Sequence, residues 1–213
     1  ALLQEISALA PEALLTDTAS LKTPLLAAAQ ALRPGSRFVG GHPMAGSRSE
    51  GVAAARADLF RDRPWAFVPT DRSDPDAIAT LSDLVRGIGA RPVVLEAERH
   101  DLLMTWISHL PHAVAVGLTR AAAAETGSDL AALAGPGFLD TTRIAGRRLE
   151  LALELALADP EALARAVDAV VGELSSLSAR LRQGDADAVA CFFQEAAAIR
   201  RAVEPQTPSD SRG

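Results

Sequence analysis

The segment 40–46, Gly-Gly-His-Pro-Met-Ala-Gly, places a histidine between a pair of glycines and a proline. It follows the run Phe38-Val39, so the pattern predicts a strand that ends in a tight loop with few Cβ atoms, where backbone can approach a ligand. Imidazole has an ordinary pKa near neutrality, and open α/β sheets bind ligands at the carboxyl ends of their strands. His42 is therefore a candidate acid–base group, although a loop histidine without chemistry has the same local pattern.

Two further histidines, His109 and His112, are three residues apart and share a helix face. Asp101 precedes them by close to whole numbers of turns and is expected on the same face. Pro111 predicts a kink near Ile107-Ser108, because it lacks the N–H that the helix needs. Packed interior histidines, a metal site and an anion or substrate site all agree with this pattern. Ligands spread over three turns span about 16 Å, which disfavours a single ion.

Two loops carry other polar groups. Residues 16–22, Thr-Asp-Thr-Ala-Ser-Leu-Lys, end with Lys22, the only lysine in a chain whose other 20 basic residues are arginine. Either a compact ammonium is needed there or the lysine survives by chance. The unusual segment 135–145 interrupts two helices, and its Arg143 is suited to bidentate carboxylate binding or to a surface pair with Asp140.

These residues need an α/β scaffold followed by helices. Strands and helices alternate up to Glu96, which predicts βαβ units and a largely parallel sheet. Helices are expected at 2–9, 24–32, 52–59 and 76–88, and strands at 13–17, 37–40, 65–68 and 91–95. Beyond Glu96 only helices are predicted, at 97–125, 129–134, 137–144, 149–157, 160–181 and 186–203, with a turn at Gly184-Asp185. The predicted divisions are an α/β part (1–96), a helical part (97–204) and a disordered tail (205–213).

Composition excludes several classes of function. The chain is 48% hydrophobic and 23% charged, with a net charge of −6, which is typical of a globular protein rather than a nucleic-acid binder. Cys191 is the only cysteine, so neither a disulfide framework nor a cysteine-built metal site is expected. No uninterrupted apolar run approaches the roughly 20 residues of a membrane span. We expect a soluble, cytoplasmic protein.

The chain resembles the prephenate dehydrogenase family, which includes arogenate and cyclohexadienyl dehydrogenases. The resemblance depends on the order and spacing of five pieces that are individually weak. They are Asp17-Thr18-Ala19-Ser20-Leu21-Lys22, Gly41-His42-Pro43-Met44-Ala45-Gly46, Leu59-Phe60 with Pro69-Thr70, His100-Asp101 with Ser108-His109-Leu110-Pro111-His112, and Thr142-Arg143-Ile144-Ala145.

The resemblance implies oxidative decarboxylation of prephenate or arogenate with NAD or NADP, in tyrosine biosynthesis. It implies that His42 accepts a hydrogen bond from the ring hydroxyl, that Ser20 orients His42 beside the nicotinamide, and that Arg143 holds a substrate carboxylate. It further implies a Rossmann-like sheet domain and a helical dimerisation domain, hence a homodimer. The remaining implied residues are His109, His112 and Ser47 for substrate, and Asp17, Ser20 and Pro43 for cofactor.

The Gly-x-Gly-x-x-Gly turn that cradles a dinucleotide pyrophosphate is missing from these residues. The chain therefore resembles a family member that lacks the N-terminal part of its dinucleotide-binding domain. We expect these 213 residues alone to form a dimer without measurable NAD(P) binding. The alternative function is a non-catalytic dimeric fragment or a dicarboxylate-binding remnant. The choices between NAD and NADP, and between prephenate and arogenate, stay open.

Overall fold

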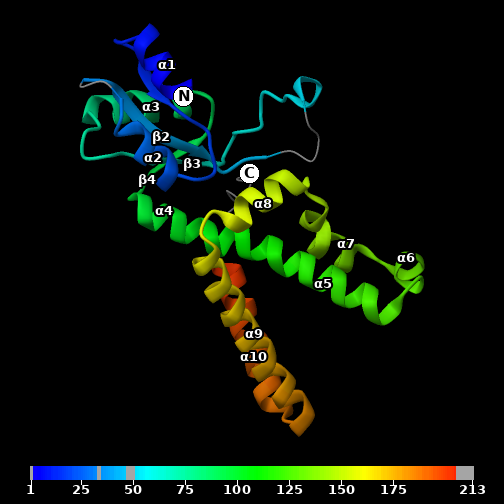
Figure 1. Ribbon diagram of the computed structural model, residues 1–213. Coiled ribbons are helices and arrows are strands. Elements are labelled where there is room, and N and C mark those ends of the chain that lie inside the picture. Colours follow the sequence, from blue (N-terminus) through cyan, green and yellow to red (C-terminus); the bar gives the residue numbers. More distant parts are fainter. Residues whose placement is uncertain (1, 33–34, 47–50, 205–213) are drawn as a thin grey trace, which may run out of the picture. The chain divides into compact units, whose positions relative to one another are not determined.

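The computed structural model describes residues 2–32, 35–46 and 51–204. By its internal contacts the chain divides into two compact units, Ala1–Leu163 and Ala164–Gly213. The first unit contains one four-stranded sheet in the order β1-β2-β3-β4, of which β2, β3 and β4 are labelled in Figure 1. The strands are β1 (Leu14–Thr16), β2 (Arg37–Pro43), β3 (Pro64–Val68) and β4 (Arg91–Val94).

The sheet is parallel at both ends and antiparallel in the middle. β1 pairs with β2 and β3 with β4 in parallel, whereas β2 and β3 run in opposite directions. Parallel neighbours need a long crossover, usually a helix. The helix predicted at 52–59 is wrong, because its described counterpart is only the short 3₁₀ turn η1 (Val52–Ala54). The described part of the connection contains no crossover helix, and β3 runs antiparallel to β2.

This pairing also corrects the predicted loop after Gly40. β2 continues to Pro43, and His42 lies opposite Ala66 of β3. The backbone of His42 is therefore held in a ladder rather than in a free turn. Because successive strand residues point to opposite faces, His42 lies on the same face as Phe38, two pleats away.

Helices cover both faces of the sheet. On one face, α3 (Pro75–Gly87) packs Ala77, Leu81 and Val85 against aromatic side chains of β3, and Phe67 is fully buried there. Asp74 caps α3 by accepting from the N–H of Asp76 at 2.9 Å, as an N-cap residue should. On the other face lie α1 (Leu2–Leu9) and α2 (Thr23–Ala29), whose apolar side chains form a second cluster with β2 and β3.

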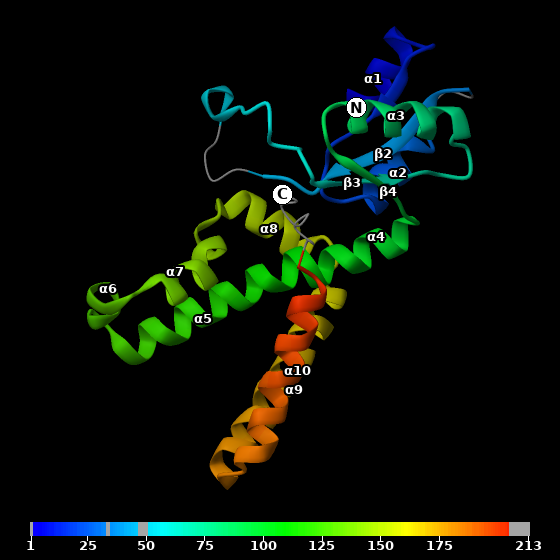
Figure 2. The ribbon, with the colours of Figure 1, turned by 180° about the vertical axis from the view of Figure 1, so that it is seen from behind.

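One long helical run follows the sheet, green in Figures 1 and 2. It consists of α4 (Ala97–Met104), the π-helical segment η2 (Thr105–His109) and α5 (Leu110–Thr126). The predicted break before Pro111 is confirmed as this π segment, a common response to a disrupted helical ladder. By length and composition alone the run is apolar enough to cross a membrane, a test that core helices also pass. Its imidazoles at 100, 109 and 112 are buried inside the folded unit.

The remaining predicted helices are confirmed to within a few residues. α5 contacts α6 (Asp129–Leu133), α7 (Pro136–Thr142) and the 3₁₀ segment η3 (Arg143–Gly146), and α8 (Leu149–Leu157) follows them. α9 (Pro160–Gln183) and α10 (Ala186–Ala202) form an antiparallel pair around the predicted turn at Gly184, which has a φ of 68°. Within this pair Arg180 donates to the carbonyl of Ala188 at 3.3 Å. The tail predicted at 205–213 lies outside the described residues.

Candidate active site

His42 lies near the carboxyl end of β2, with only 8% of its surface exposed. Its ring packs edge-to-face against the ring of His100 on α4, with centroids 5.2 Å apart. Nδ1 of His42 is 2.9 Å from Nε2 of His100, which is hydrogen-bond distance. The helical run thus places the imidazole of His100 in contact with that of His42.

Asp101 completes a chain of three polar groups. Its Oδ1 lies 2.8 Å from Nδ1 of His100, and its Oδ2 accepts from the backbone N–H of Thr23 at 3.0 Å and from the Thr23 hydroxyl. The N–H of Lys22 adds a longer bond of 3.3 Å to Oδ1. The carboxylate therefore joins α4 to the first residues of α2, and the order along the chain of contacts is His42, His100, Asp101.

The lone lysine is fully buried beneath this site. Lys22 Nζ donates to Asp17 and, at 2.6 Å, to the carbonyl of Gly41. Asp17 in turn accepts from the N–H of Gly41 and from that of Ala19, each at 2.8 Å. Of the two interpretations of Lys22, this burial favours the one in which a compact ammonium is needed. These interactions among Asp17, Lys22 and Gly41, here called the brace, connect the loop after β1 to the backbone beside His42.

The brace leaves no room for a side chain at position 41. A Cβ on Gly41 would lie 2.7 Å from the Thr16 hydroxyl and closer still to the carbonyl of Asp17. We expect Gly41→Ala to lower the free energy of unfolding by about 1–3 kcal/mol, the usual cost of overpacking, measured by urea denaturation. The matched control is Gly46→Ala, since no atom of the described residues lies within 4 Å of a Cβ there. Equal stability of the two variants would contradict this packing.

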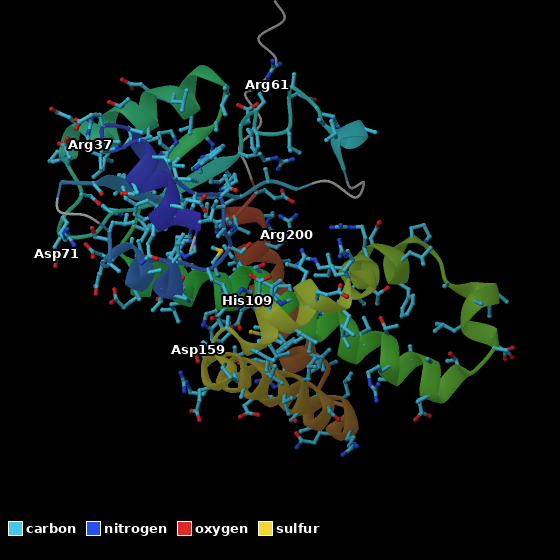
Figure 3. The ribbon with its side chains drawn as sticks, turned by 45° about the horizontal axis from the view of Figure 1, so that its top comes forward. Arg37, Arg61, Asp71, His109, Asp159 and Arg200 are labelled. Carbon is cyan, nitrogen blue, oxygen red and sulfur yellow. The ribbon has the colours of Figure 1, made fainter. Side chains whose placement is uncertain are left out.

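His109 and His112 lie farther along the helical run, and Figure 3 labels His109 on it. Both are buried, and within the described part of the chain neither Nε2 has a hydrogen-bond partner. Burial lowers the pKa of each imidazole, and the charge of Arg147 lowers both further, while Asp101 raises that of His109. Buried polar atoms without partners are rare in proteins. Together with the nearby charge of Arg147, they are candidate contacts for a polar ligand.

The described residues contain no group of three or more histidine, cysteine, aspartate or glutamate side chains placed to hold a metal ion. The polar groups of the site are arranged instead as hydrogen-bonded pairs between β2, α2 and α4.

The electrostatics of the site keep His42 neutral near pH 7. Burial lowers the pKa of His42 from 6.5 to about 4, and the charge of Lys22 adds to this, as a proton on His100 would. Burial acts to raise the pKa of Asp101, but hydrogen bonds from His100 and Thr23 outweigh it and lower this pKa to about 2. Burial also lowers the pKa of Lys22, against the opposing effect of Asp17. At neutral pH the ring of His42 therefore keeps one bare nitrogen, which can accept a hydrogen bond.

The pKa of His42 predicts acid sensitivity. Unfolded histidine binds a proton at about pH 6.5 but folded His42 only at about 4, so between these values the unfolded state holds more protons. The free energy of unfolding should therefore fall as pH drops through this window, by about 3 kcal/mol from His42 alone. Urea titrations at successive pH values measure this, and His42→Gln should flatten the slope. Stability that is constant or rises toward pH 4 would contradict the neutral, buried state.

The structure brings some of the predicted site residues together and leaves others apart. Pro43 follows His42 at the end of β2, and Ser20 is half-buried in the loop before α2. The partner found for His42 is His100, whereas the resemblance implied Ser20. Arg143 is exposed at the start of η3. Ser47 lies outside the described residues.

Three contributors were missed by sequence reasoning as site residues: His100, Asp101 as its partner, and Arg147. The adjacent His100-Asp101 pair was noticed only as part of a resemblance. Neighbours on a helix point about 100° apart, so nothing in their spacing shows that one side chain contacts the other. Arg147 carries no local signal that distinguishes it from Arg148 beside it.

The fold and the site define a class of two-part proteins. In this class a mixed α/β sheet, with a buried histidine near the end of one strand, is followed by a helical part. Comparison with known proteins specifies the class further. Residues 1–94 match the family model for the prephenate dehydrogenase nucleotide-binding domain, and residues 96–199 match the prephenate dehydrogenase dimerization domain. The chain belongs to the prephenate dehydrogenase family.

Individual relatives agree with this assignment. Prephenate dehydrogenase of Lactococcus lactis is 32% identical over 195 residues, covering 90% of this chain and 53% of the relative. The crystal structure of Synechocystis arogenate dehydrogenase superposes with a TM-score of 0.80 at 30% identity, covering 94% of this chain and 74% of that one. That of A. aeolicus prephenate dehydrogenase with hydroxyphenyl propionate and NAD⁺ gives 0.84 at 25% identity, covering 94% and 71%. The chain spans about half the length of the curated relatives it matches.

Proposed function

We propose that the protein catalyses oxidative decarboxylation of prephenate or arogenate with NAD or NADP, giving 4-hydroxyphenylpyruvate or tyrosine. The observation that carries the proposal is His42, a buried imidazole kept neutral at the carboxyl end of β2. The relatives are named for prephenate, arogenate and cyclohexadienyl substrates, and the likeness extends over both halves of the chain. In this proposal the helical part contributes the second requirement, an arginine that binds a carboxylate of the substrate.

In this proposal His42 acts on the ring hydroxyl. A nicotinamide dinucleotide supplies the hydride acceptor when it is bound. As hydride leaves the hydroxyl-bearing carbon, the hydroxyl proton shifts toward Nε2 of His42, because Nδ1 is already held by His100. Loss of the ring carboxylate as carbon dioxide makes the ring aromatic, and the proton returns to the phenolic oxygen. His42 thus stabilises charge as it develops on oxygen, which is general acid–base assistance.

The remaining proposed roles concern binding. Arg143 holds a substrate carboxylate, and His109, His112 and Ser47 line the same pocket. The structural support for a ligand there is that neither Nε2 has a hydrogen-bond partner among the described residues. Bidentate arginine contacts give such recognition its geometry.

The residues present fit the nicotinamide end of the cofactor. β1 and β2 are parallel, and their carboxyl ends are held together where the Gly41 N–H donates to Asp17 at 2.8 Å. We place the nicotinamide at this edge, beside Ser20 and Pro43. Both oxygens of Asp17 are engaged by protein donors, so its proposed contribution to cofactor binding is to shape the loop. The glycine-rich turn for the pyrophosphate is not among these 213 residues.

We also propose a homodimer that uses α9 and α10, with the nucleotide-binding part ending near residue 96 and the helical part extending over 97–204. Large apolar side chains are exposed on this helical pair, which is typical of a surface that another chain covers. They are Val171, Leu174, Leu181, Phe193 and Ile199. We propose a cytoplasmic location, without nucleic-acid or membrane partners.

The proposal is tested with the protein expressed from its complete reading frame. Formation of reduced cofactor is followed for prephenate and arogenate, each with NAD and NADP. We expect turnover with one substrate–cofactor combination at least, accompanied by release of carbon dioxide, and light scattering should report a dimer. Binding of a dicarboxylate without turnover in all four combinations would support the alternative, a non-catalytic remnant.

A further inference from the structure

The contacts of His42 determine its position and also which of its ring nitrogens carries a proton. His42, His100 and Asp101 form an uninterrupted chain of hydrogen bonds, of 2.9 Å between the imidazoles and 2.8 Å from imidazole to carboxylate. The chain is buried: His100 has no exposed surface and His42 has 8%. Each imidazole nitrogen in such a chain must be either a donor or an acceptor, and its neighbour decides which.

The order of donors can be worked out from the carboxylate. Asp101 already accepts from the N–H groups of Lys22 and Thr23 and from the Thr23 hydroxyl, so it is held ionised and can only accept. His100 must then carry its proton on Nδ1, and the Nε2 of a neutral His100 becomes an acceptor. The Nδ1 of His42 must therefore carry a proton and donate it. In a neutral His42 the bare nitrogen is Nε2.

We propose that Asp101 and His100 are positioning residues that set the tautomer of His42, so that its bare Nε2 is presented to the substrate hydroxyl. This inference rests on the proposed function for its catalytic consequence, but the tautomer itself is a property of the folded protein. The proton stays on His42 Nδ1 throughout. As Nε2 takes charge from the substrate, the imidazolium that develops is stabilised through His100 by the carboxylate.

The other charged groups near His42 do not supply this function. Lys22, just before α2, donates to Asp17 and to the carbonyl of Gly41, so it orders the backbone rather than the ring of His42. His109 of η2 acts on His42 through its charge alone. Among the hydrogen bonds of the described residues, the one to an imidazole nitrogen of His42 comes from His100, which is held in turn by Asp101.

Asp101→Asn tests the idea with almost no change in shape. Two donors of Thr23 meet Oδ2, whereas Oδ1 accepts only the longer bond from the N–H of Lys22 besides its contact with His100. The single amide oxygen is therefore expected at the Oδ2 position, which turns the amide NH₂ toward Nδ1 of His100. His100 must then carry its proton on Nε2 and donate to His42. That places the His42 proton on Nε2 and removes the acceptor. An analogous change of tautomer in a catalytic triad lowers kcat by about 10⁴-fold without disturbing the geometry.

We expect Asp101→Asn to lower kcat by roughly 10³–10⁴-fold with KM changed by less than about threefold. The matched control is Thr23→Val, which also removes a hydrogen bond from this carboxylate but leaves the direction of donation intact, so its kcat should stay within a few-fold of the native value. Asp101→Asn with native kcat would overturn the proposal. So would equal losses in the two variants, because these indicate a merely structural role.

A second measurement needs no enzyme activity. NMR spectra of the native protein with isotope-labelled histidine distinguish protonated from bare ring nitrogens. We expect His42 to be protonated on Nδ1 and bare on Nε2, and the opposite in Asp101→Asn. A native His42 with its proton on Nε2 would overturn the tautomer assignment even if dehydrogenase activity is present. The expected spectrum in a protein without activity would overturn the proposed function and leave the tautomer assignment standing.

Discussion

His42→Asn is expected to lower kcat by roughly 10²–10⁴-fold with little change in KM, the usual range for loss of general acid–base assistance. Asparagine is smaller than histidine and polar, so it can still donate toward Nε2 of His100, which now lies 2.9 Å from the ring of His42. It has no group that takes a proton near neutral pH. Steady-state kinetics on the full-length protein measure the effect.

The same substitution at His112 serves as the control for His42. His112 is also buried, at 8% exposure, but it lies on α5 rather than β2. If it binds substrate, its loss should raise KM and spare kcat. A native kcat in His42→Asn would remove His42 from the mechanism, whatever happens at His112.

Arg143→Gln is expected to raise KM by about 10- to 100-fold, because a hydrogen bond to a charged group contributes about 1.5–3 kcal/mol. Arg143→Lys should restore binding only in part, since an ammonium lacks the planar fork that matches a carboxylate. Initial rates over a range of substrate concentrations separate KM from kcat. A lysine variant with native KM would argue against bidentate binding.

Arg147→Gln is the informative comparison for Arg143. Arg147 is the arginine whose charge acts on His109 and His112, whereas Arg143 lies exposed at the start of η3. If Arg143 holds the carboxylate, Arg147→Gln should have the smaller effect on KM. A large rise in KM for Arg147→Gln alone would transfer the role to Arg147.

The order of the elements could be predicted from the sequence because the local signals were strong. Proline near the start of α2, α3 and α9, and the Asp74 cap of α3, locate helices independently of tertiary contacts. The antiparallel pairing of β2 with β3 could not be predicted, because the sequence predicted a helix at 52–59 between these strands. The described part of that segment contains no such helix. The consequence of this pairing is that His42 lies in a strand.

The candidate site was predictable only in part. His42 was singled out by its glycine-rich neighbours, and Lys22 by its rarity. Asp101 does act on His109 electrostatically, as a shared face implied. The contact of His42 with His100 joins residues 58 apart in sequence, and periodicity within one helix carries no information about such pairs. The π segment η2 also shifts later residues around the helix, which a count of 3.6 residues per turn cannot represent.

The burial of Lys22 also determines the surface chemistry of this chain. It is the sole lysine of the sequence and has no exposed surface, so the folded chain offers acylating reagents no ε-amine. Reagents that modify arginine can react at many positions. Reagents that modify lysine side chains can react only when α2 separates from the sheet and exposes Lys22. The acylation rate of Lys22 therefore reports how often the region around His42 opens. Ligands that stabilise the closed form of this region should lower the acylation rate of Lys22.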